Sequence, residues 1–469
     1  MKQDIIRPNV KNFIKSLRDM GYNFEIAVAD IIDNSITAKA KEIHIQTLDS
    51  PEITLSILDD GVGMSENELV EAMRLGSKDP DNIRDNKDLG RFGLGLKTAS
   101  FSQCKRLTVI TKQEKNIFAR QWDLDYIVQK DDWYLTDLKN EELTNYPQFN
   151  ELLKSETGTL IIWEYLDNTE PTTFTNTIYS LRDHLALVFH RFLEGEFSKV
   201  NITVNNIPVE AFNPFNENNS ATQRLSMEKF QPSKEYAFVK VYPYILPHYS
   251  KVSRYEYEKF STSEGYTKTQ GFYLYRAGRL LVHGTWWGLA KVGEAHKLVR
   301  IKIDIPNDQD HLWSIDIKKS IAQPKNQIKK DLKRILATVL DKGSRVYTGR
   351  GKSINKSSSV PMWKVTIDNN HIKFSINKEH PLLQLVKEST TELDIFNSYV
   401  KALEAYLPIN AIQSHLVSEP HKINQESLIS EDEIAELAAK LKEMDLSEDH
   451  LKAILETELF KNKKELLEL

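Results

Sequence analysis

The pattern of hydrophobic and polar positions divides the N-terminal third of the chain into short helices and strands. Across residues 12–38, apolar side chains recur at three- and four-residue spacing, which predicts a mainly helical segment. Strands are predicted where apolar residues alternate with polar ones or form short runs between turn residues: Glu42–Leu48, Ile53–Leu58, Leu107–Thr111 and Thr159–Tyr165. Helices interleaved with these strands predict a two-layer α/β sandwich and an α+β fold class.

A helix is also predicted over residues 65–75, because Ser65 and Glu68 have the spacing of a capping box. The polar segment Ser77–Asp88 that follows is typical of a mobile loop.

The pattern changes near residue 200 and again near residue 350. A second α/β domain over residues 196–347, after a first domain over 1–195, is indicated by a predicted helix at Gln327–Leu340 and by short strands: Ile202–Val204, Ala237–Tyr242, Gly271–Tyr275, Leu280–Val282 and Val299–Ile305. Residues 348–360 have the composition of a linker. The C-terminal region, 361–469, is predicted to be largely helical, with a hairpin at Trp363–Ile376 and helical segments around 391–406 and 430–468.

Composition changes this picture little. The 469 residues suffice for two or three domains, and a formal net charge of −5 says little about partners. Cys104 is the single cysteine, which excludes an intrachain disulfide and a cysteine-based zinc site. No apolar segment approaches the roughly 20 residues of a membrane-spanning helix, and no signal-peptide core follows Met1, so we expect a cytoplasmic protein without membrane contact.

Three short motifs carry candidate chemistry. In the first, Asp30-Ile31-Ile32-Asp33-Asn34, Asp30 and Asn34 lie four residues apart and would project from one helix face. A carboxylate there could position an attacking water, and the amide oxygen of Asn34 could bind Mg²⁺, which prefers hard oxygen ligands. Taken alone, the same spacing is also typical of a solvent-facing helix.

The second motif, Asp59-Asp60-Gly61-Val62-Gly63, follows a predicted strand. The Asp59 carboxylate could accept a hydrogen bond from an adenine amino group, and the glycines would let the base approach the backbone. An ordinary Asp-Gly turn is the alternative.

The third motif, Gly90-Arg91-Phe92-Gly93-Leu94-Gly95-Leu96-Lys97, is glycine-rich and leads into a helix. Its backbone N–H groups and the helix N-terminus could bind phosphate oxygens. The spacing differs from that of the Rossmann fingerprint and of the Walker A loop, so neither of these nucleotide folds is predicted.

Together these motifs resemble those of the GHKL ATPases, the class of gyrase, heat-shock chaperones, histidine kinases and MutL, and are most similar to its prokaryotic MORC and MutL-like branch. A fourth segment, Thr157–Trp163, resembles the Gly-Thr box near the adenine. The resemblance covers residues 1–345 and implies a Bergerat-type ATP-binding fold, ATP and Mg²⁺ as cofactors, Asp30 as catalytic base and Asn34 as metal ligand. It further implies nucleotide-binding roles for Asn34, Asp59, Gly61, Gly63, Met64, Ser77, Lys78, Gly90, Arg91, Phe92, Gly93, Leu94, Gly95, Lys97 and Thr159.

Position 30 departs from the family, which mostly has Glu there. The shorter aspartate withdraws the carboxylate by one methylene, roughly 1.5 Å. A misplacement of that order can cost on the order of 100-fold in rate. We therefore expect a slow ATPase with Asp30 as its base, and a non-hydrolysing nucleotide sensor is the alternative.

The second domain resembles the transducer domain of MutL, gyrase and MORC proteins. Tyr273–Leu281 is similar to its Arg-Leu hairpin, and Trp313–Ser320 to the segment before its last helix. In that class a lysine of this domain reaches the γ-phosphate. The resemblance makes Lys319 the candidate, with Lys318 and Lys325 as alternatives.

Two further segments bear on partners. Residues 318–356 carry twelve Lys or Arg against Asp331 and Asp341, so they could contact DNA phosphates or form a solvated helix face. Residues 426–469 could bind a partner protein or pack as a terminal helix.

The resemblance implies an ATP-dependent homodimer that acts as a DNA-associated clamp, with a role in restriction or anti-phage defence. A heat-shock-type chaperone is the main alternative. A histidine kinase is disfavoured, since only about twenty residues precede the first motif.

Overall fold

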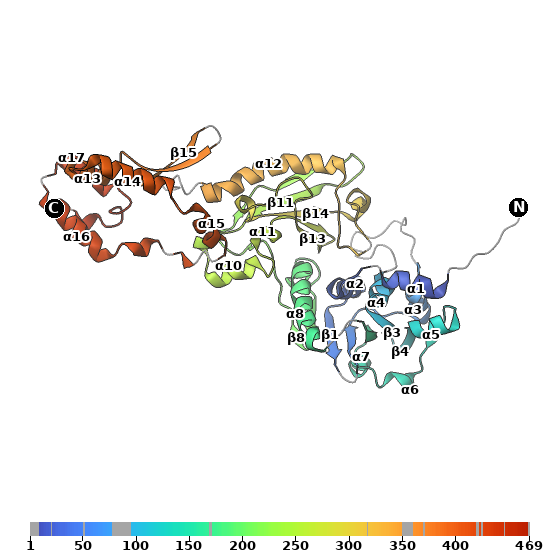
Figure 1. Cartoon of the computed structure of the whole chain (residues 1–469). Coiled ribbons are helices and arrows are strands. Elements are labelled where there is room, and N and C mark those ends of the chain that lie inside the picture. Colours follow the sequence, from blue (N-terminus) through green and yellow to red (C-terminus); the bar gives the residue numbers. More distant parts are fainter. Residues whose placement is uncertain are drawn as a thin grey trace. The chain divides into compact units, whose positions relative to one another are not determined.

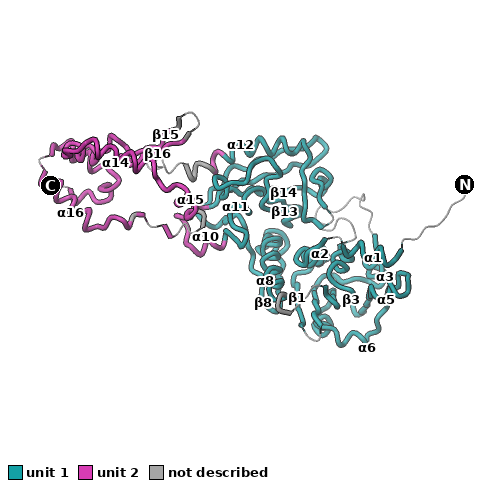
Figure 2. The backbone as a smooth tube through the Cα atoms, viewed as in Figure 1, with its two compact units in different colours: residues 1–246, 260–340 teal, residues 247–259, 341–469 magenta. Residues whose placement is uncertain are grey.

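The computed structural model describes residues 9–19, 21–49, 52–76, 95–167, 171–316, 318–348, 360–368, 371–418, 422–423, 425–444 and 446–467. The chain divides into two compact units (Figure 2). Unit 1 comprises residues 1–246 and 260–340, and unit 2 comprises residues 247–259 and 341–469. Each unit is described by itself.

The first half of unit 1 is built on an eight-stranded sheet of order β5-β4-β3-β6-β2-β1-β7-β8. Its strands are β1 (Glu42–Leu48), β2 (Thr54–Asp59), β3 (Cys104–Gln113), β4 (Asn116–Asp123), β5 (Thr136–Asp137), β6 (Gly158–Leu166), β7 (Asn201–Val204) and β8 (Ile207–Pro208). All neighbours pair antiparallel except β1 and β7, which are parallel. The four strands predicted in this region are confirmed.

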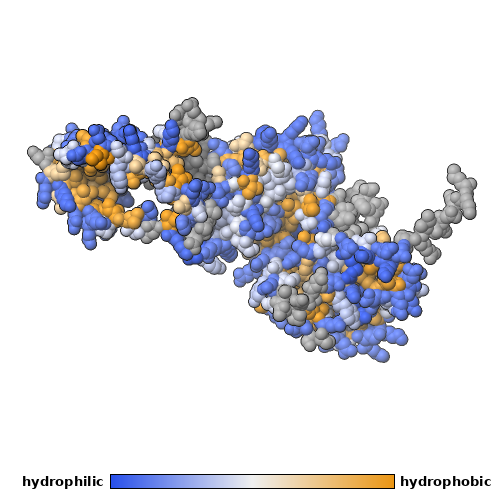
Figure 3. Space-filling view, in the orientation of Figure 1, coloured by the Kyte–Doolittle hydropathy of each residue, from blue (hydrophilic) through white to orange (hydrophobic). Residues whose placement is uncertain are grey.

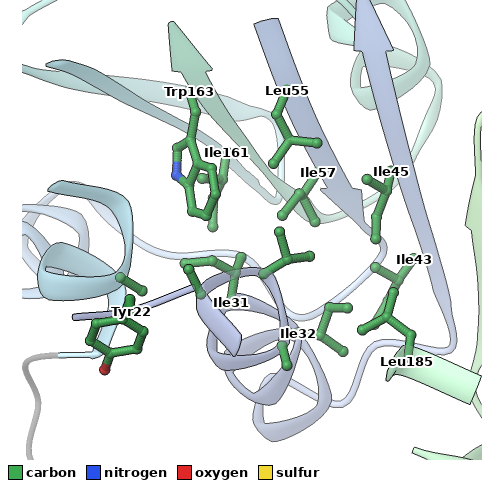
Figure 4. Packing of buried hydrophobic residues seen from close by; sticks show 14 of the residues in the cluster. Tyr22, Ile31, Ile32, Ile43, Ile45, Leu55, Ile57, Ile161, Trp163 and Leu185 are labelled. Atoms are coloured by element: carbon green, nitrogen blue, oxygen red, sulfur yellow. The ribbon is translucent and has the colours of Figure 1, made fainter. Parts of the chain in front are cut away.

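The helices of this part of unit 1 are α1 (Val10–Arg18), α2 (Phe24–Thr37), α3 (Glu66–Met73), α4 (Gly95–Phe101), α5 (Leu124–Lys130), α6 (Asn140–Leu143), α7 (Phe149–Lys154), α8 (Pro171–Val188) and α9 (His190–Leu193). Helix α2 packs its apolar side chains onto one face of the sheet (Figure 4). Ile31 and Ile32 lie against side chains from the central strands, including Ile57 and Trp163, all of them essentially buried. The two-layer α/β arrangement is thus confirmed.

The mainly helical segment predicted over residues 12–38 is interrupted, because α1 and α2 are separate helices. Gly21 has φ +72°, a left-handed conformation that does not continue a helix. Asn23 then caps α2, and its side chain accepts a hydrogen bond from the Ile26 N–H at 2.9 Å. This break brings Tyr22 beside the middle of α2. Helix α3, in contrast, begins at the predicted capping box of Ser65 and Glu68.

The second half of unit 1 is a second sheet of order β10-β11-β14-β12-β13, with β9 paired to β11. Its elements are β9 (Gln223–Arg224), β10 (Glu228–Phe230), β11 (Val239–Ile245), α11 (Tyr266–Thr269), β12 (Gly271–Arg276), β13 (Arg279–Thr285), η2 (Glu294–His296), β14 (Val299–Ile305), η3 (Asn307–Leu312) and most of α12 (Asn326–Thr348). Ile328, Leu332 and Ile335 on one face of α12 are buried in its core. Ile202–Val204, predicted as part of the second domain, instead joins the first sheet as β7.

Unit 2 contains η1 (Tyr249–Lys251), most of α10 (Arg254–Ser261), a hairpin and helices that follow it. These are β15 (Trp363–Asp368), β16 (His371–Ile376), α13 (Pro381–Ser389), α14 (Leu393–Ala405), α15 (Ile409–Ser418), η6 (Glu426–Leu428), α16 (Glu431–Glu443), α17 (Glu448–Leu455) and η7 (Lys464–Leu466) (Figure 1). The hairpin forms as predicted, but the helical segment around 430–468 is divided. Ser447 caps α17, and Leu441 of α16 and Ile454 of α17 share one small core.

The described helices include none that is both long and apolar enough to cross a membrane.

Candidate active site

The first motif lies on α2, whose apolar face is fixed on the sheet. Asp30 is 2% exposed and Asp33 is fully buried, whereas Asn34 is exposed. Asn34 is therefore open to a ligand from solvent, one helical turn after a buried carboxylate. The metal-binding role of Asn34 stays a prediction, and the described residues include no group of three or more His, Cys, Asp or Glu side chains that could hold a metal ion.

Both carboxylate oxygens of Asp30 accept hydrogen bonds. The Tyr22 hydroxyl donates to Oδ2 at 3.0 Å, and the Lys319 ammonium donates to Oδ1 at 3.2 Å. Burial raises the pKa of Asp30 above its ordinary value, although the positive charge of Lys319 opposes this rise. Burial, followed by the charge of Asp30, raises the pKa of Tyr22, so the hydroxyl stays a donor.

Lys319 also contacts Asp33, and this contact is the shorter one. Its ammonium lies 2.6 Å from Asp33 Oδ2. Arg279 Nε lies 2.8 Å from the other oxygen, Asp33 Oδ1, although neither atom has a well-directed hydrogen bond within the described residues. This contact is therefore an ion pair whose N–H is not aimed at the oxygen. The family resemblance predicted Lys319 at this site. It did not predict Asp33 or Arg279, although Asp33 lies within the first motif and Arg279 within the Arg-Leu hairpin.

Arg279 directly follows the turn that joins β12 and β13. Ala277 and Gly278 both have positive φ, at +48° and +86°, as a two-residue type I′ hairpin turn requires. Arg276 and Arg279 face each other across that turn. Arg279 turns toward α2, whereas Arg276 forms a separate buried ion pair with Asp310, at 2.7 Å.

The second motif forms a separate polar cluster at the end of β2. Asp59 Oδ2 accepts from the Ser35 hydroxyl at 2.7 Å, and Oδ1 accepts from the Gly61 N–H at 2.9 Å. Burial raises the pKa of Asp59 to about 6, against the lowering effect of these two donors. Ser35, one residue after Asn34, was not among the predicted site residues.

Neighbouring residues fix the backbone around Asp59. Thr159 lies opposite Asp59 on β6, and the Thr111 hydroxyl accepts from the Met64 N–H at 2.9 Å. Gly63 has φ +66°, and a Cβ built there would lie 2.1 Å from the Lys112 carbonyl oxygen, so no side chain fits. Gly61, Gly63, Met64 and Thr159 are therefore gathered near Asp59, and their shared nucleotide-binding role stays a prediction.

The third motif is described only from Gly95 onward. Ser77, Lys78, Gly90, Arg91, Phe92, Gly93 and Leu94 lie outside the described residues. Gly95 begins α4, and a Cβ built there would lie 3.9 Å from Asp30 Oδ2, so α4 starts beside the first motif. Lys97 is buried and donates to the Ala72 carbonyl oxygen at 2.8 Å, and its contact with phosphate stays a prediction.

Comparisons with known proteins indicate an ATPase family for this part of the chain. Residues 22–159 match the family described as histidine kinase-, DNA gyrase B-, and HSP90-like ATPase. Over 109 residues the chain is 33% identical to the ATPase morc-1 of Caenorhabditis elegans. That alignment covers 23% of this chain and 12% of the relative, so the chain matches only a small part of that protein's length.

Proposed function

We propose that this chain, whose residues 22–159 are a GHKL ATPase domain of the MORC-like type, is an ATP-gated molecular clamp that hydrolyses ATP slowly. The buried carboxylate of Asp30, held against Lys319 of the transducer-like part, is the observation that carries the proposal. It joins a candidate general base to a candidate γ-phosphate ligand.

The described residues support a division of roles. Asp59, in its ionised form, would accept a hydrogen bond from the adenine amino group. Asn34 would hold Mg²⁺, which would neutralise charge on the phosphates. A water oxygen would form a bond to the γ-phosphorus as the bond to the leaving ADP oxygen breaks, and Asp30 would take the water proton.

Dimerisation by ATP is the proposed consequence of binding, since the transducer-like sheet and the ATP site are linked through Lys319 and Arg279. DNA is the proposed partner of the clamp, supported by the basic side chains around α12. A defence role rests only on the resemblance to prokaryotic MORC-like proteins. A heat-shock-type chaperone and a non-hydrolysing scaffold are the competing functions.

The deciding experiment compares ATP turnover and ATP-dependent dimerisation in the wild type, Asp30→Asn and Asp30→Glu. We expect Asp30→Asn to lower turnover by about 100-fold or more, because removing the base leaves the water proton without an acceptor. The dimer should persist in ATP. Asp30→Glu tests whether the missing methylene makes the wild type slow, and faster turnover is expected.

Nucleotide binding without turnover in all three proteins would favour the scaffold and refute the hydrolytic clamp. Suppression of client-protein aggregation, with no binding to DNA at low salt, would favour the chaperone.

A further inference from the structure

Four buried charged side chains meet at Asp30, and three separate segments supply them. Asp30 and Asp33 come from α2, Arg279 from β13, and Lys319 from the loop after η3; their side chains are between 0% and 9% exposed. Two acids balance two bases. Burying charges costs several kcal/mol per ion unless each is well paired, so such a cluster is a poor way merely to stabilise a fold.

Asp33 is the anchor of this cluster. Its two oxygens each lie near a cation, with Lys319 at 2.6 Å and Arg279 at 2.8 Å. Asp30 is more weakly held, at 3.2 Å from Lys319 and 3.9 Å from Arg279. Lys319 can therefore leave Asp30 while it keeps its stronger partner.

The backbone at Lys319 has an unusual conformation, and the neighbouring turn is held by hydrogen bonds. Lys319 has φ +55°, a conformation that non-glycine residues rarely adopt and that occurs at functional sites. Asp316 stabilises this turn, because its Oδ1 accepts from the N–H groups of Ser320 and Ile321, at 2.8 and 2.9 Å. The Lys319 side chain therefore starts from a fixed backbone position.

We propose that Asp33 and Arg279 are positioning residues that hold the Lys319 amine where it can pass from Asp30 to the γ-phosphate of ATP. The inference rests on the proposed function. While Lys319 is paired with Asp30, its positive charge opposes proton uptake by that carboxylate. The γ-phosphate competes for Lys319, so that Asp30 becomes a stronger base when ATP is bound. Because Arg279 belongs to the β12–β13 hairpin, this movement of Lys319 from Asp30 to the γ-phosphate depends on the position of that hairpin.

The test measures the ratio of ADP to ATP dissociation constants by calorimetry, because Lys319 would contact only the γ-phosphate. Arg279→Gln should lower the preference for ATP by about tenfold, in the range of ordinary coupling energies. Arg276→Gln is the matched control, since Arg276 lies opposite Arg279 at the same turn but forms a separate buried ion pair with Asp310. The control should keep the wild-type preference. Thermal unfolding verifies that each variant is folded.

Combining Arg279→Gln with Lys319→Met distinguishes a positioning role from nonspecific disruption of the binding site. In the Lys319→Met background, Arg279→Gln should not change the preference for ATP any further. Nonspecific disruption would instead lower that preference further. Asp33→Asn, which keeps the side-chain shape, provides a second variant with the same expectation if Arg279→Gln does not fold.

An unchanged preference in the folded variants, or equal losses in Arg279→Gln and Arg276→Gln, would overturn the positioning role alone. Failure of the wild type to bind ATP would overturn the proposed function and this inference together.

Discussion

Asp59 is a buried carboxylate whose proton is held more tightly than in water. It has hydrogen-bond donors on both oxygens, from Ser35 and Gly61, yet burial still raises its pKa to about 6. The group would serve the adenine as an acceptor only when ionised. Its protonation therefore falls inside the pH range in which ATP binding is easily measured.

We expect ATP affinity to fall as the pH drops from 7 to 5, because protonated Asp59 loses its acceptor role. Stability should change in the opposite sense. The pKa of Asp59 in the folded state exceeds its ordinary value of 3.8, so between about pH 4 and about pH 6 the folded state binds more protons than the unfolded state. The Asp59 contribution to stability therefore falls as pH rises.

Calorimetric titration and denaturant unfolding at pH 5 and 7 measure the two effects. In Asp59→Asn the corresponding pH dependence should vanish from both. Loss of affinity at pH 5 in equal measure for the variant and the wild type would exclude Asp59 as the titrating group.

At the scale of elements, the segment between β2 and α3 is pressed against β3. Gly63 makes that approach possible, because a Cβ there would lie 2.1 Å from the backbone oxygen of Lys112 and its φ is +66°. Gly288 provides a comparison: its φ is +75°, but a Cβ there would meet nothing within 4 Å. The two glycines share a backbone conformation and differ in surroundings.

Gly63→Ala should therefore destabilise the fold more than Gly288→Ala. The Gly288 variant carries mainly the cost of the left-handed backbone, about 1 kcal/mol. The Gly63 variant must also displace a strand, so we expect a further 1–3 kcal/mol, about the cost of overpacking. Denaturant unfolding measures the free energy of unfolding of both variants. Equal losses of stability in the two variants would show that β3 can move aside for the added methyl group without a further loss of stability.

The sequence predicted elements well wherever a local signal determined them. The alternation in Glu42–Leu48 predicted β1 to the residue, and Ser65 with Glu68 predicted the start of α3. It failed at Gly21, where the apolar spacing continued through a break in the backbone. The ion pair of Asp33 with Arg279 left no local signal, because it joins residues far apart in the chain and depends on how two sheets pack.

At the scale of the whole molecule, α12 combines a buried apolar face with a basic exposed one. Lys330 and Lys333 are exposed, while Ile328 and Leu332 on the opposite side are buried. Lys318 and Lys319, counted in the same basic block, are directed elsewhere: Lys318 donates to Gly21 O at 3.2 Å, and Lys319 binds Asp33. The proposed DNA surface therefore begins after these two residues.

Replacing Lys330 and Lys333 with Glu should weaken binding to double-stranded DNA and lower the slope of log affinity against log salt by about two, since two phosphate contacts are lost. Lys115→Glu with Lys154→Glu is the matched control, because both are exposed and the net charge changes equally. Binding titrations at several salt concentrations measure the slopes. Equal slopes in the two variants would show that α12 is a solvated face.

Unit 2 carries exposed apolar side chains among its charged ones (Figure 3). Ile395, Tyr399 and Tyr406 are 68%, 62% and 84% exposed. The sequence predicted helices in this region but not that they would form a core of their own around Ile454 and Phe460. Binding of a partner protein to these helices stays a prediction.

The parallel pairing of β1 with β7 has a consequence for how the protein is made. Residues 42–48 emerge from the ribosome long before residues 201–204, and until then β1 presents an unpaired edge to other chains. An early arrest of synthesis would leave a sheet prone to join a neighbour's. Lys319 emerges later still, so the first sheet can form on the nascent chain before Asp30, the proposed base, meets the lysine that is proposed to regulate it.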